Sequence, residues 1–168
     1  MSPCLSRFAC TAVFRHIESS LPGRHRFGQG ICGNGSVLDR GATGPLYLSR
    51  QEIAKLVVDA LQDGDHKLQR YQLHAFVVMP NHVHILVTPK VTSSQWLGPL
   101  KGFTAYRANE LLGSHGQTFW QDESNDHLVR SEGEFDRIRA YIEENPVTAG
   151  LVSGAEQYPW SSAANQTA

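Results

Sequence analysis

The stretch that decides the fold is YQLHAFVVMPNHVHILVTP, residues 71–89. Two apolar runs lie on either side of Pro80-Asn81, a pair of residues that is common in tight turns. Runs rich in β-branched and aliphatic residues around such a turn are typical of antiparallel hairpins. The stretch therefore predicts two paired strands, at residues 71–79 and 82–88.

The second of these strands carries two histidines inside an otherwise aliphatic run. Side chains alternate along a strand, so His82 and His84 share one face, with α-carbons about 6.6 Å apart. Val83, Ile85 and Val87 then take the other face and can be buried beneath helices. Two imidazoles at this spacing can bind one cation. Two hydrogen-bonded histidines on a half-exposed sheet face explain the pattern equally well.

Two helices are predicted on either side of the hairpin. The first begins at a capping box formed by Ser49 and Glu52, continues with apolar residues at helical spacing, and ends at Asp63-Gly64. The second spans residues 93–112. Its candidate buried positions are Trp96, Leu97, Leu100, Phe103, Leu111 and Leu112.

A third helix is predicted near the C-terminus, at residues 132–144. Ser131 and Glu134 form a second capping box before it, and Asn145-Pro146 is expected to end it because proline breaks helices. Two further strands are predicted, at residues 8–18 and at residues 126–130.

The order of strands and helices predicts the fold class. Strands mixed with helices, including one antiparallel hairpin, indicate an α+β fold of the ferredoxin-like (RRM-like) sandwich type, with helices packed on one face of an antiparallel sheet. A chain of 168 residues is long enough for a single domain. Within it, residues 1–45 hold the first strand and a Gly-rich loop, and residues 46–168 hold the core.

Composition narrows the function. Fifteen Lys and Arg against sixteen Asp and Glu give a net charge of −1, which argues against a protein that coats nucleic acid through a large basic surface. Cys4, Cys10 and Cys32 form neither a metal-ligand pair nor a disulfide framework. The sequence contains neither a signal peptide nor an apolar run of membrane-spanning length. We therefore expect a reduced cytoplasmic protein without a membrane partner.

A second unusual segment is RIRAYIEENPVTAGLV, residues 137–152. Tyr141 and Asn145 are four residues apart and share one face of the predicted helix, whereas Ile138 and Ile142 can face the core. Tyrosine can act as a nucleophile, and an amide oxygen suits Mg²⁺ or Mn²⁺. An ordinary tyrosine of an amphipathic helix, followed by an asparagine that stops the helix before proline, explains the pair as well.

Together these segments resemble a known family. The segment LHAFVVMPNHVHILV resembles the motif of HUH single-strand endonucleases, in which two histidines flank one hydrophobic residue. The segments YIEENPVTAGLV and YPWSSA resemble the C-terminal part of REP-associated tyrosine transposases, relatives of the insertion-sequence transposases that use a single tyrosine. LKGFTAYRANELLG and FWQDESNDHLVR match the same family in the right order, so that the resemblance covers residues 46–163.

The resemblance implies a site and a reaction. It makes His82, His84 and Asn145 the ligands of a divalent metal ion, Mg²⁺ or Mn²⁺, and Tyr141 the catalytic nucleophile. It implies cleavage and transfer of single-stranded or hairpin DNA through a 5′-phosphotyrosine intermediate, in DNA transposition or on REP-like hairpins. The resemblance also implies a location in the bacterial cytosol or nucleoid. Relatives work as monomers or as homodimers.

Candidate DNA contacts are weaker in the sequence, because a solvated surface explains each of them equally well. They are Lys101, Tyr106, Arg107, His127 and Arg130. His74 is expected to be a packed or supporting histidine rather than a ligand.

The chain departs from the family in two places. Residues 1–45 fit it poorly, and Asn125 stands where relatives usually carry an aromatic residue. Two other functions therefore remain open. One is a non-catalytic hairpin-DNA-binding protein domesticated from a transposase. The other is a histidine-triad-like nucleotide hydrolase, for which the third histidine position is occupied by Leu86.

Overall fold

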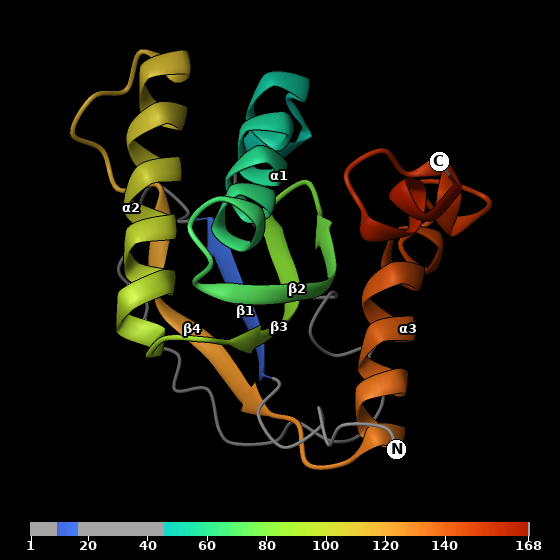
Figure 1. The fold of residues 1–168 in the computed structure, drawn as a ribbon. Helices are drawn as coiled ribbons and strands as arrows, with labels where there is room; N and C mark the ends of the chain where they lie inside the picture. Colours follow the sequence, from blue (N-terminus) through green and yellow to red (C-terminus); the bar gives the residue numbers. More distant parts are fainter. Residues whose placement is uncertain (1–9, 17–45, 168) are drawn as a thin grey trace, which may run out of the picture.

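The computed structural model describes residues 10–16 and 46–167 (Figure 1). In chain order the strands and helices are β1 (Cys10–His16), α1 (Gln51–His66), β2 (Tyr71–Val78), β3 (His82–Pro89), α2 (Ser93–Leu112), β4 (Trp120–Leu128) and α3 (Glu132–Thr148). Among the described residues there are also three short 3₁₀ turns, η2 (Tyr47–Ser49), η3 (Ala155–Gln157) and η4 (Ser162–Thr167). The ends of the first strand predicted at 8–18, and the loop that follows it, lie outside the described residues.

The four strands form one antiparallel sheet in the order β2-β3-β1-β4. With the chain order βαββαβ this is the ferredoxin-like arrangement, and the predicted α+β class is confirmed. The predicted hairpin of β2 and β3 is also confirmed, with His84 opposite Val77 and Val83 opposite Val78. Because β1 pairs with the other edge of β3, the histidine-bearing strand lies inside the sheet rather than at its edge.

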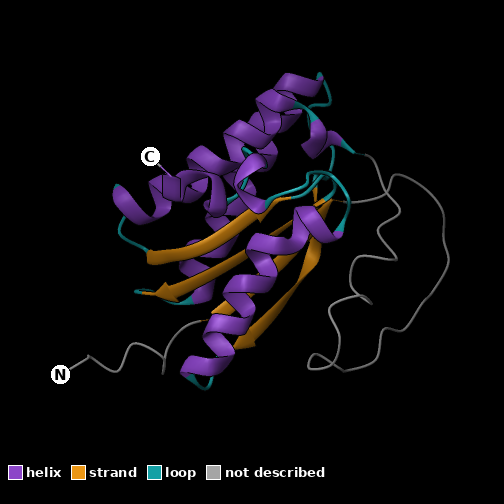
Figure 2. Ribbon diagram, turned by 90° about the vertical axis from the view of Figure 1, so that its right-hand side faces the viewer, coloured by secondary structure: helices purple, strands orange, loops and turns teal. Residues whose placement is uncertain are grey.

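Helices cover both faces of the sheet, so the expectation of helices on one face alone needs a correction (Figure 2). Helices α1 and α2 pack with Val83, Ile85 and Val87 in the larger apolar cluster, as the ferredoxin-like core requires. Helix α3 packs on the opposite face, in a second cluster formed by Ala75, Val77, Met79, Leu86, Val129 and Ile142. Helix α3 packs there because this face of the sheet has an apolar surface. Leu86 lies on the same face of β3 as His82 and His84, and neighbouring residues of β2 extend the apolar surface.

Helix α1 differs at both ends from the prediction. Arg50 is its N-cap and no side chain caps it; Ser49 Oγ donates to the carbonyl of Leu46 and Glu52 pairs with Arg50, so the predicted capping box is absent. At the other end the helix continues past Asp63 to His66.

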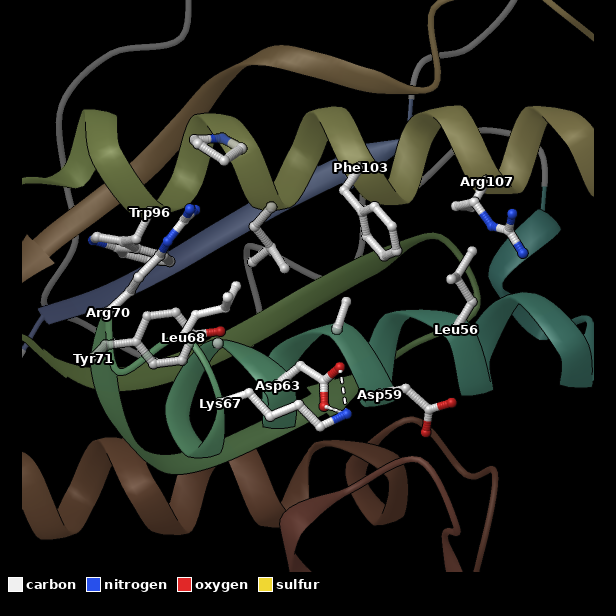
Figure 3. Close-up of a pocket in the computed structure, with 14 residues that line it drawn as sticks. Leu56, Asp59, Asp63, Lys67, Leu68, Arg70, Tyr71, Trp96, Phe103 and Arg107 are labelled. Atoms are coloured by element: carbon white, nitrogen blue, oxygen red, sulfur yellow. Dashed lines mark hydrogen bonds and ion pairs between the residues drawn. The ribbon is translucent and has the colours of Figure 1, made fainter.

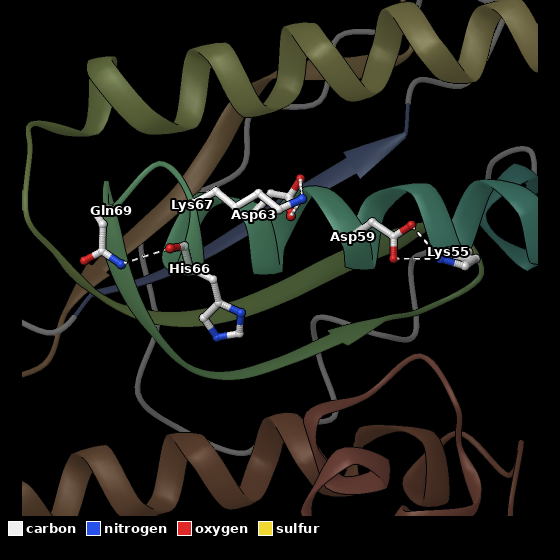
Figure 4. Close-up of polar contacts among 6 residues, drawn as sticks. All are labelled: Lys55, Asp59, Asp63, His66, Lys67 and Gln69. Atoms are coloured by element: carbon white, nitrogen blue, oxygen red, sulfur yellow. Dashed lines mark hydrogen bonds and ion pairs between the residues drawn. The ribbon is translucent and has the colours of Figure 1, made fainter.

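Gly64, in the C-terminal part of α1, lies directly against the ring of Tyr71. The Tyr71 ring packs so closely on Gly64 that any Cβ at this position would collide with it. The Tyr71 hydroxyl donates to the carbonyl of Leu61 at 2.9 Å. On the solvent side, Lys55 pairs with Asp59 and Lys67 with Asp63, each one helical turn apart (Figure 4).

Helix α2 has the predicted bounds, but two of its candidate core residues are exposed. Phe103 is 54% and Leu111 49% exposed, whereas Trp96, Leu97 and Leu100 are buried. The buried stripe passes through Thr104, whose hydroxyl accepts a hydrogen bond from Trp120 Nε1 at 2.9 Å and thereby turns Phe103 outward.

Helix α3 continues beyond Asn145 and Pro146 to Thr148, so the prediction that these residues end the helix was wrong. Proline removes one backbone donor, but the last turn is retained because the N–H of Ala149 donates to the carbonyl of Asn145 at 2.9 Å. Ser131 caps the N-terminus as predicted; the Glu134 carboxylate, however, accepts from the N–H of Arg130 rather than completing a capping box.

Strand β4 is longer than the predicted strand at residues 126–130. It begins at Trp120 and ends at Leu128.

The chain after α3 returns to the outer edge of β2. The N–H of Val78 donates to the carbonyl of Trp160 at 2.9 Å, Val77 forms an isolated bridge with Ser161, and the N–H of Phe76 donates to Ser162 Oγ at 3.2 Å. These bonds occupy backbone groups that an edge strand otherwise leaves open. In the described residues, no helix has the length and apolarity that crossing a membrane requires.

Candidate functional site

His82 and His84 lie side by side in the interior, between the sheet and α3. Each is only 3% exposed. This rules out the alternative of two histidines on a half-exposed face of the sheet. Their rings meet edge-on, with centroids 4.7 Å apart and planes inclined by 85°. The two imidazoles therefore share one face of β3, as strand alternation predicted.

Tyr141 of α3 reaches this pair. Its ring meets that of His84 edge-on, with centroids 5.6 Å apart. At the start of the helix, Phe135 meets His74 of β2 in the same way, at 5.0 Å. Helix α3 therefore runs in the direction of β2, from the level of His74 to the level of Val77 and its partner His84.

This register also places Asn145. The residue lies one turn beyond Tyr141, about 6 Å further along the axis at 1.5 Å per residue. Because β3 is antiparallel to β2, the same direction leads from His84 to His82, about 6.6 Å away. Asn145 is only 1% exposed and thus lies on the covered side of α3, at the level of His82.

The three residues offer a donor set for a metal ion. His82 Nε2, His84 Nε2 and Asn145 Oδ1 are buried atoms that make no hydrogen bond in the described part of the chain, although each residue has other contacts. Imidazole nitrogens suit transition metals, and an amide oxygen suits Mg²⁺ or Mn²⁺. Among residues 10–16 and 46–167, no three His, Cys, Asp or Glu side chains are grouped so that they could hold a metal ion. The site at His82 and His84 differs in that its third donor is an amide. The chemistry of these three donors fits a divalent cation.

The other ring nitrogen of His82 has a defined partner. Nδ1 lies 2.7 Å from Oδ1 of Asn81, the residue before it in the turn between β2 and β3. The sequence analysis did not identify Asn81, although its place next to a histidine in a polar turn was a usable signal.

His74 lies outside this cluster, as the sequence suggested. Its Nε2 lies 2.8 Å from Thr88 Oγ1 and its ring packs on Phe135. Burial lowers the pKa of His74 below its usual value, so the ring is a neutral packed histidine.

The structure separates the candidate DNA contacts into two groups. Lys101, Tyr106 and Arg107 lie on α2, which covers the face of the sheet away from the histidines. Lys101 donates to the carbonyl of Gln121, Arg107 pairs with Glu110 at 3.1 Å, and Tyr106 is 63% exposed. These three residues are not brought near Tyr141.

The second group lies at the start of α3, the helix that carries Tyr141. His127 Nε2 lies 2.8 Å from Glu134 Oε1, and Arg130 is exposed. Two hydrogen bonds hold the pKa of Glu134 below its usual value. The one from the backbone N–H of Arg130 has the larger effect, and the one from His127 comes second. The carboxylate is therefore charged at neutral pH and fixes this corner of the fold.

A groove of about 580 Å³ opens between α1 and α2, and the sequence analysis did not foresee it (Figure 3). Its lining combines the buried rings of Tyr71 and Trp96 and the exposed Phe103 with charges of both signs, among them Asp59 and Arg107. Of the candidate functional residues it includes only Arg107.

Comparison with known proteins gives a family match and structural matches. Residues 49–145, more than half of the chain, match the family described as "Transposase IS200 like". Among solved structures, a REP-associated tyrosine transposase bound to a REP hairpin is similar, with a TM-score of 0.61 and 16% sequence identity over 96% of this chain and 80% of that chain. At this identity the likeness establishes the fold alone. No curated protein matches the sequence.

Proposed function

The chain belongs to the IS200-like transposases, and on that premise we propose that it is a metal-dependent single-strand DNA endonuclease and strand transferase with Tyr141 as its nucleophile. The observation that carries the proposal is the contact of the Tyr141 and His84 rings, with centroids 5.6 Å apart. A phenol on one element and a pair of imidazoles on another meet at one buried point, which packing alone would fill with aliphatic side chains.

The proposed step is a transesterification. The Tyr141 oxygen attacks the phosphorus of the scissile phosphodiester as it gives up its proton, and the bond between phosphorus and the 3′ oxygen breaks. The released 3′ oxygen takes up a proton, and the 5′ end stays attached to Tyr141. The number of phosphodiester bonds is conserved, so the reverse attack by a different 3′ hydroxyl transfers the strand without an external energy source.

His82, His84 and Asn145 would hold the divalent cation, Mg²⁺ or Mn²⁺. When bound, the cation supplies Lewis-acid polarisation of a non-bridging phosphate oxygen. The protein supplies orientation: the edge-on contact with His84 restricts the Tyr141 ring, and the second apolar cluster fixes α3 against the sheet. The low exposure of both histidines limits the access of water, which favours attack by the phenol over hydrolysis.

The proposed substrate is single-stranded DNA next to a hairpin. The similar solved structure contains a transposase bound to a REP hairpin. The net charge of −1 supports recognition by shape and a few contacts rather than by bulk electrostatic attraction.

A denaturing gel tests the proposal. The protein is incubated with 5′- and 3′-labelled hairpin DNA carrying single-stranded flanks, with Mn²⁺ or Mg²⁺, beside Tyr141→Phe and His82→Ala. We expect a covalent protein–DNA band that carries the 5′-phosphate side of the cut and is lost in both variants. A band that persists in Tyr141→Phe would refute the assigned nucleophile.

Two other outcomes lead to the alternative functions. Binding of several hairpins without cleavage, with either metal, indicates a domesticated DNA-binding protein. Cleavage without an adduct indicates a hydrolase. A histidine-triad mechanism is disfavoured by Leu86, the third position of that pattern, which is fully buried in the apolar cluster under α3.

A further inference from the structure

We propose that Asn81 is a positioning residue, which holds the His82 ring with its proton on Nδ1 and so directs the lone pair of Nε2 to the cation. This inference rests on the proposed function and adds to it a residue outside the ligand set. It starts from one hydrogen bond, the 2.7 Å contact between Asn81 Oδ1 and His82 Nδ1.

The chemistry of the two groups fixes the direction of this bond. A carboxamide oxygen can only accept, so Nδ1 must donate. A neutral imidazole carries one ring proton, and with that proton on Nδ1 the Nε2 atom presents a lone pair. Metal-binding histidines in general have their second nitrogen fixed by such a partner.

The surroundings hold both partners in place. Asn81 lies in the turn between β2 and β3, where the N–H of Met79 donates to the carbonyl of His82 at 2.8 Å. On the other side of the turn, the N–H of Leu48 donates to the carbonyl of Pro80 at 3.1 Å. The asparagine backbone is therefore fixed between two anchored residues, and its side chain meets the ring of the very next residue.

The two histidines are held by different means. His84 lies between the rings of His82 and Tyr141, so that ring packing orients it. His82 contacts the ring of His84 and, through Nδ1, the amide oxygen of Asn81. Loss of the Asn81 oxygen should therefore affect His82 selectively.

The first measurement is the position of the ring proton in the metal-free protein, read from two-bond ¹H–¹⁵N correlation spectra at a pH where the ring is neutral. We expect protonated Nδ1 and unprotonated Nε2 on His82 in the wild type and in Asn81→Asp, whose carboxylate also accepts. In Asn81→Ala we expect His82 to populate both tautomers, with the His84 signals unchanged. Gln117→Ala removes an exposed amide elsewhere and serves as the control.

The second measurement is Mn²⁺ affinity by titration calorimetry without DNA. We expect a loss of about 10- to 100-fold in Asn81→Ala, and near-wild-type affinity in Asn81→Asp and Gln117→Ala. The recovery in Asn81→Asp separates positioning from a general effect on folding. If Asn81→Ala does not fold, Asn81→Ser, whose hydroxyl is too short for the same contact, takes its place.

The outcomes for this inference differ from those for the proposed function. A proton on His82 Nε2 in the wild type overturns the role of Asn81, whatever the protein does to DNA. Unchanged tautomer and Mn²⁺ affinity in Asn81→Ala also overturn it. A wild type that binds no Mn²⁺ contradicts the proposed metal site, and the spectra still decide whether Asn81 sets the tautomer.

Discussion

The ring of Tyr141 meets the ring of His84 edge-on, with centroids 5.6 Å apart and planes inclined by 85°. The first residue lies in the middle of α3 and the second in an interior strand of the sheet. Their meeting depends on the apolar cluster that seats α3, in which Ile142, next to the tyrosine, is 2% exposed.

Tyr141→Phe should abolish the covalent DNA adduct, lowering strand cleavage by at least about 10³-fold, because it removes the attacking oxygen and keeps the ring. Tyr158→Phe is the matched control. Tyr158 is another half-buried tyrosine that packs on the same cluster, and its hydroxyl donates to the carbonyl of Val78 at 2.9 Å. This control should lose about 1 kcal/mol of stability and keep the adduct. Equal loss of the adduct in both variants would count against Tyr141 as nucleophile.

Asn145→Asp should make stability depend more strongly on the metal. A carboxylate buried at this position without a cation destabilises the metal-free protein by about 3 kcal/mol, and Mn²⁺ should offset much of that loss because it binds the folded state. The measurement is the unfolding temperature with and without Mn²⁺. Asn109→Asp is the control, since Asn109 is also a buried helix residue but lies on α2, with its Nδ2 donating to the carbonyl of Gln117. A similar rescue of both variants by Mn²⁺ would contradict a metal site at Asn145.

Arg130→Ala should weaken hairpin binding more than Arg107→Ala. Arg130 is exposed beside the N-terminus of α3, whereas Arg107 already pairs with Glu110 on the far side of the sheet. We expect Arg130→Ala to lower the affinity for the hairpin about tenfold, the value of one charge-assisted hydrogen bond. The slope of the logarithm of the binding constant against the logarithm of the salt concentration should become shallower by about 0.7 to 0.9. Fluorescence anisotropy at several salt concentrations measures both. The opposite ranking would place the DNA on the face formed by α1 and α2.

Ser162→Ala should loosen the C-terminal segment from the sheet. Its hydroxyl accepts from the N–H of Phe76 at 3.2 Å and contacts the Glu143 carboxylate at 3.2 Å. Loss of this link should cost about 1 to 2 kcal/mol in the free energy of unfolding and speed hydrogen exchange at Phe76. Ser153→Ala, at an exposed position, should change neither quantity. Unchanged exchange in Ser162→Ala would show that the backbone bonds hold the segment alone.

His74→Gln should reduce the loss of stability as the pH falls. Burial lowers the pKa of His74 in the folded state below its ordinary value of 6.5. The unfolded chain therefore binds the proton more readily, so the contribution of His74 is present above pH 6.5 and is lost as the pH falls through the folded-state pKa. Urea unfolding at pH 7.5 and at successively lower pH should show a smaller decline in the variant. His115→Gln, at an exposed position, is the control and should follow the wild type.

Local patterns predicted most of the fold correctly. The hairpin of β2 and β3, the bounds of α2 and the α+β class all follow from the spacing of apolar residues and from turn residues, which act over a few positions along the chain. The predictions that failed had different causes. The exposure of Phe103 goes with a contact outside its helix, because the neighbouring Thr104 accepts a hydrogen bond from Trp120. Asn145 stays helical through a local bond, in which the N–H of Ala149 donates to its carbonyl despite the following proline.

The sequence by itself determined which residues share a face of β3 and which share a face of α3. A period of two places His82 and His84 together on β3, and a period of 3.6 places Tyr141 and Asn145 together on α3. Only the tertiary structure decided that these faces meet, with the tyrosine beside His84 and the asparagine at the level of His82. The side of the sheet that a helix covers, and how far it lies along a strand, depend on packing between residues far apart in the chain, about which local periodicity carries no information.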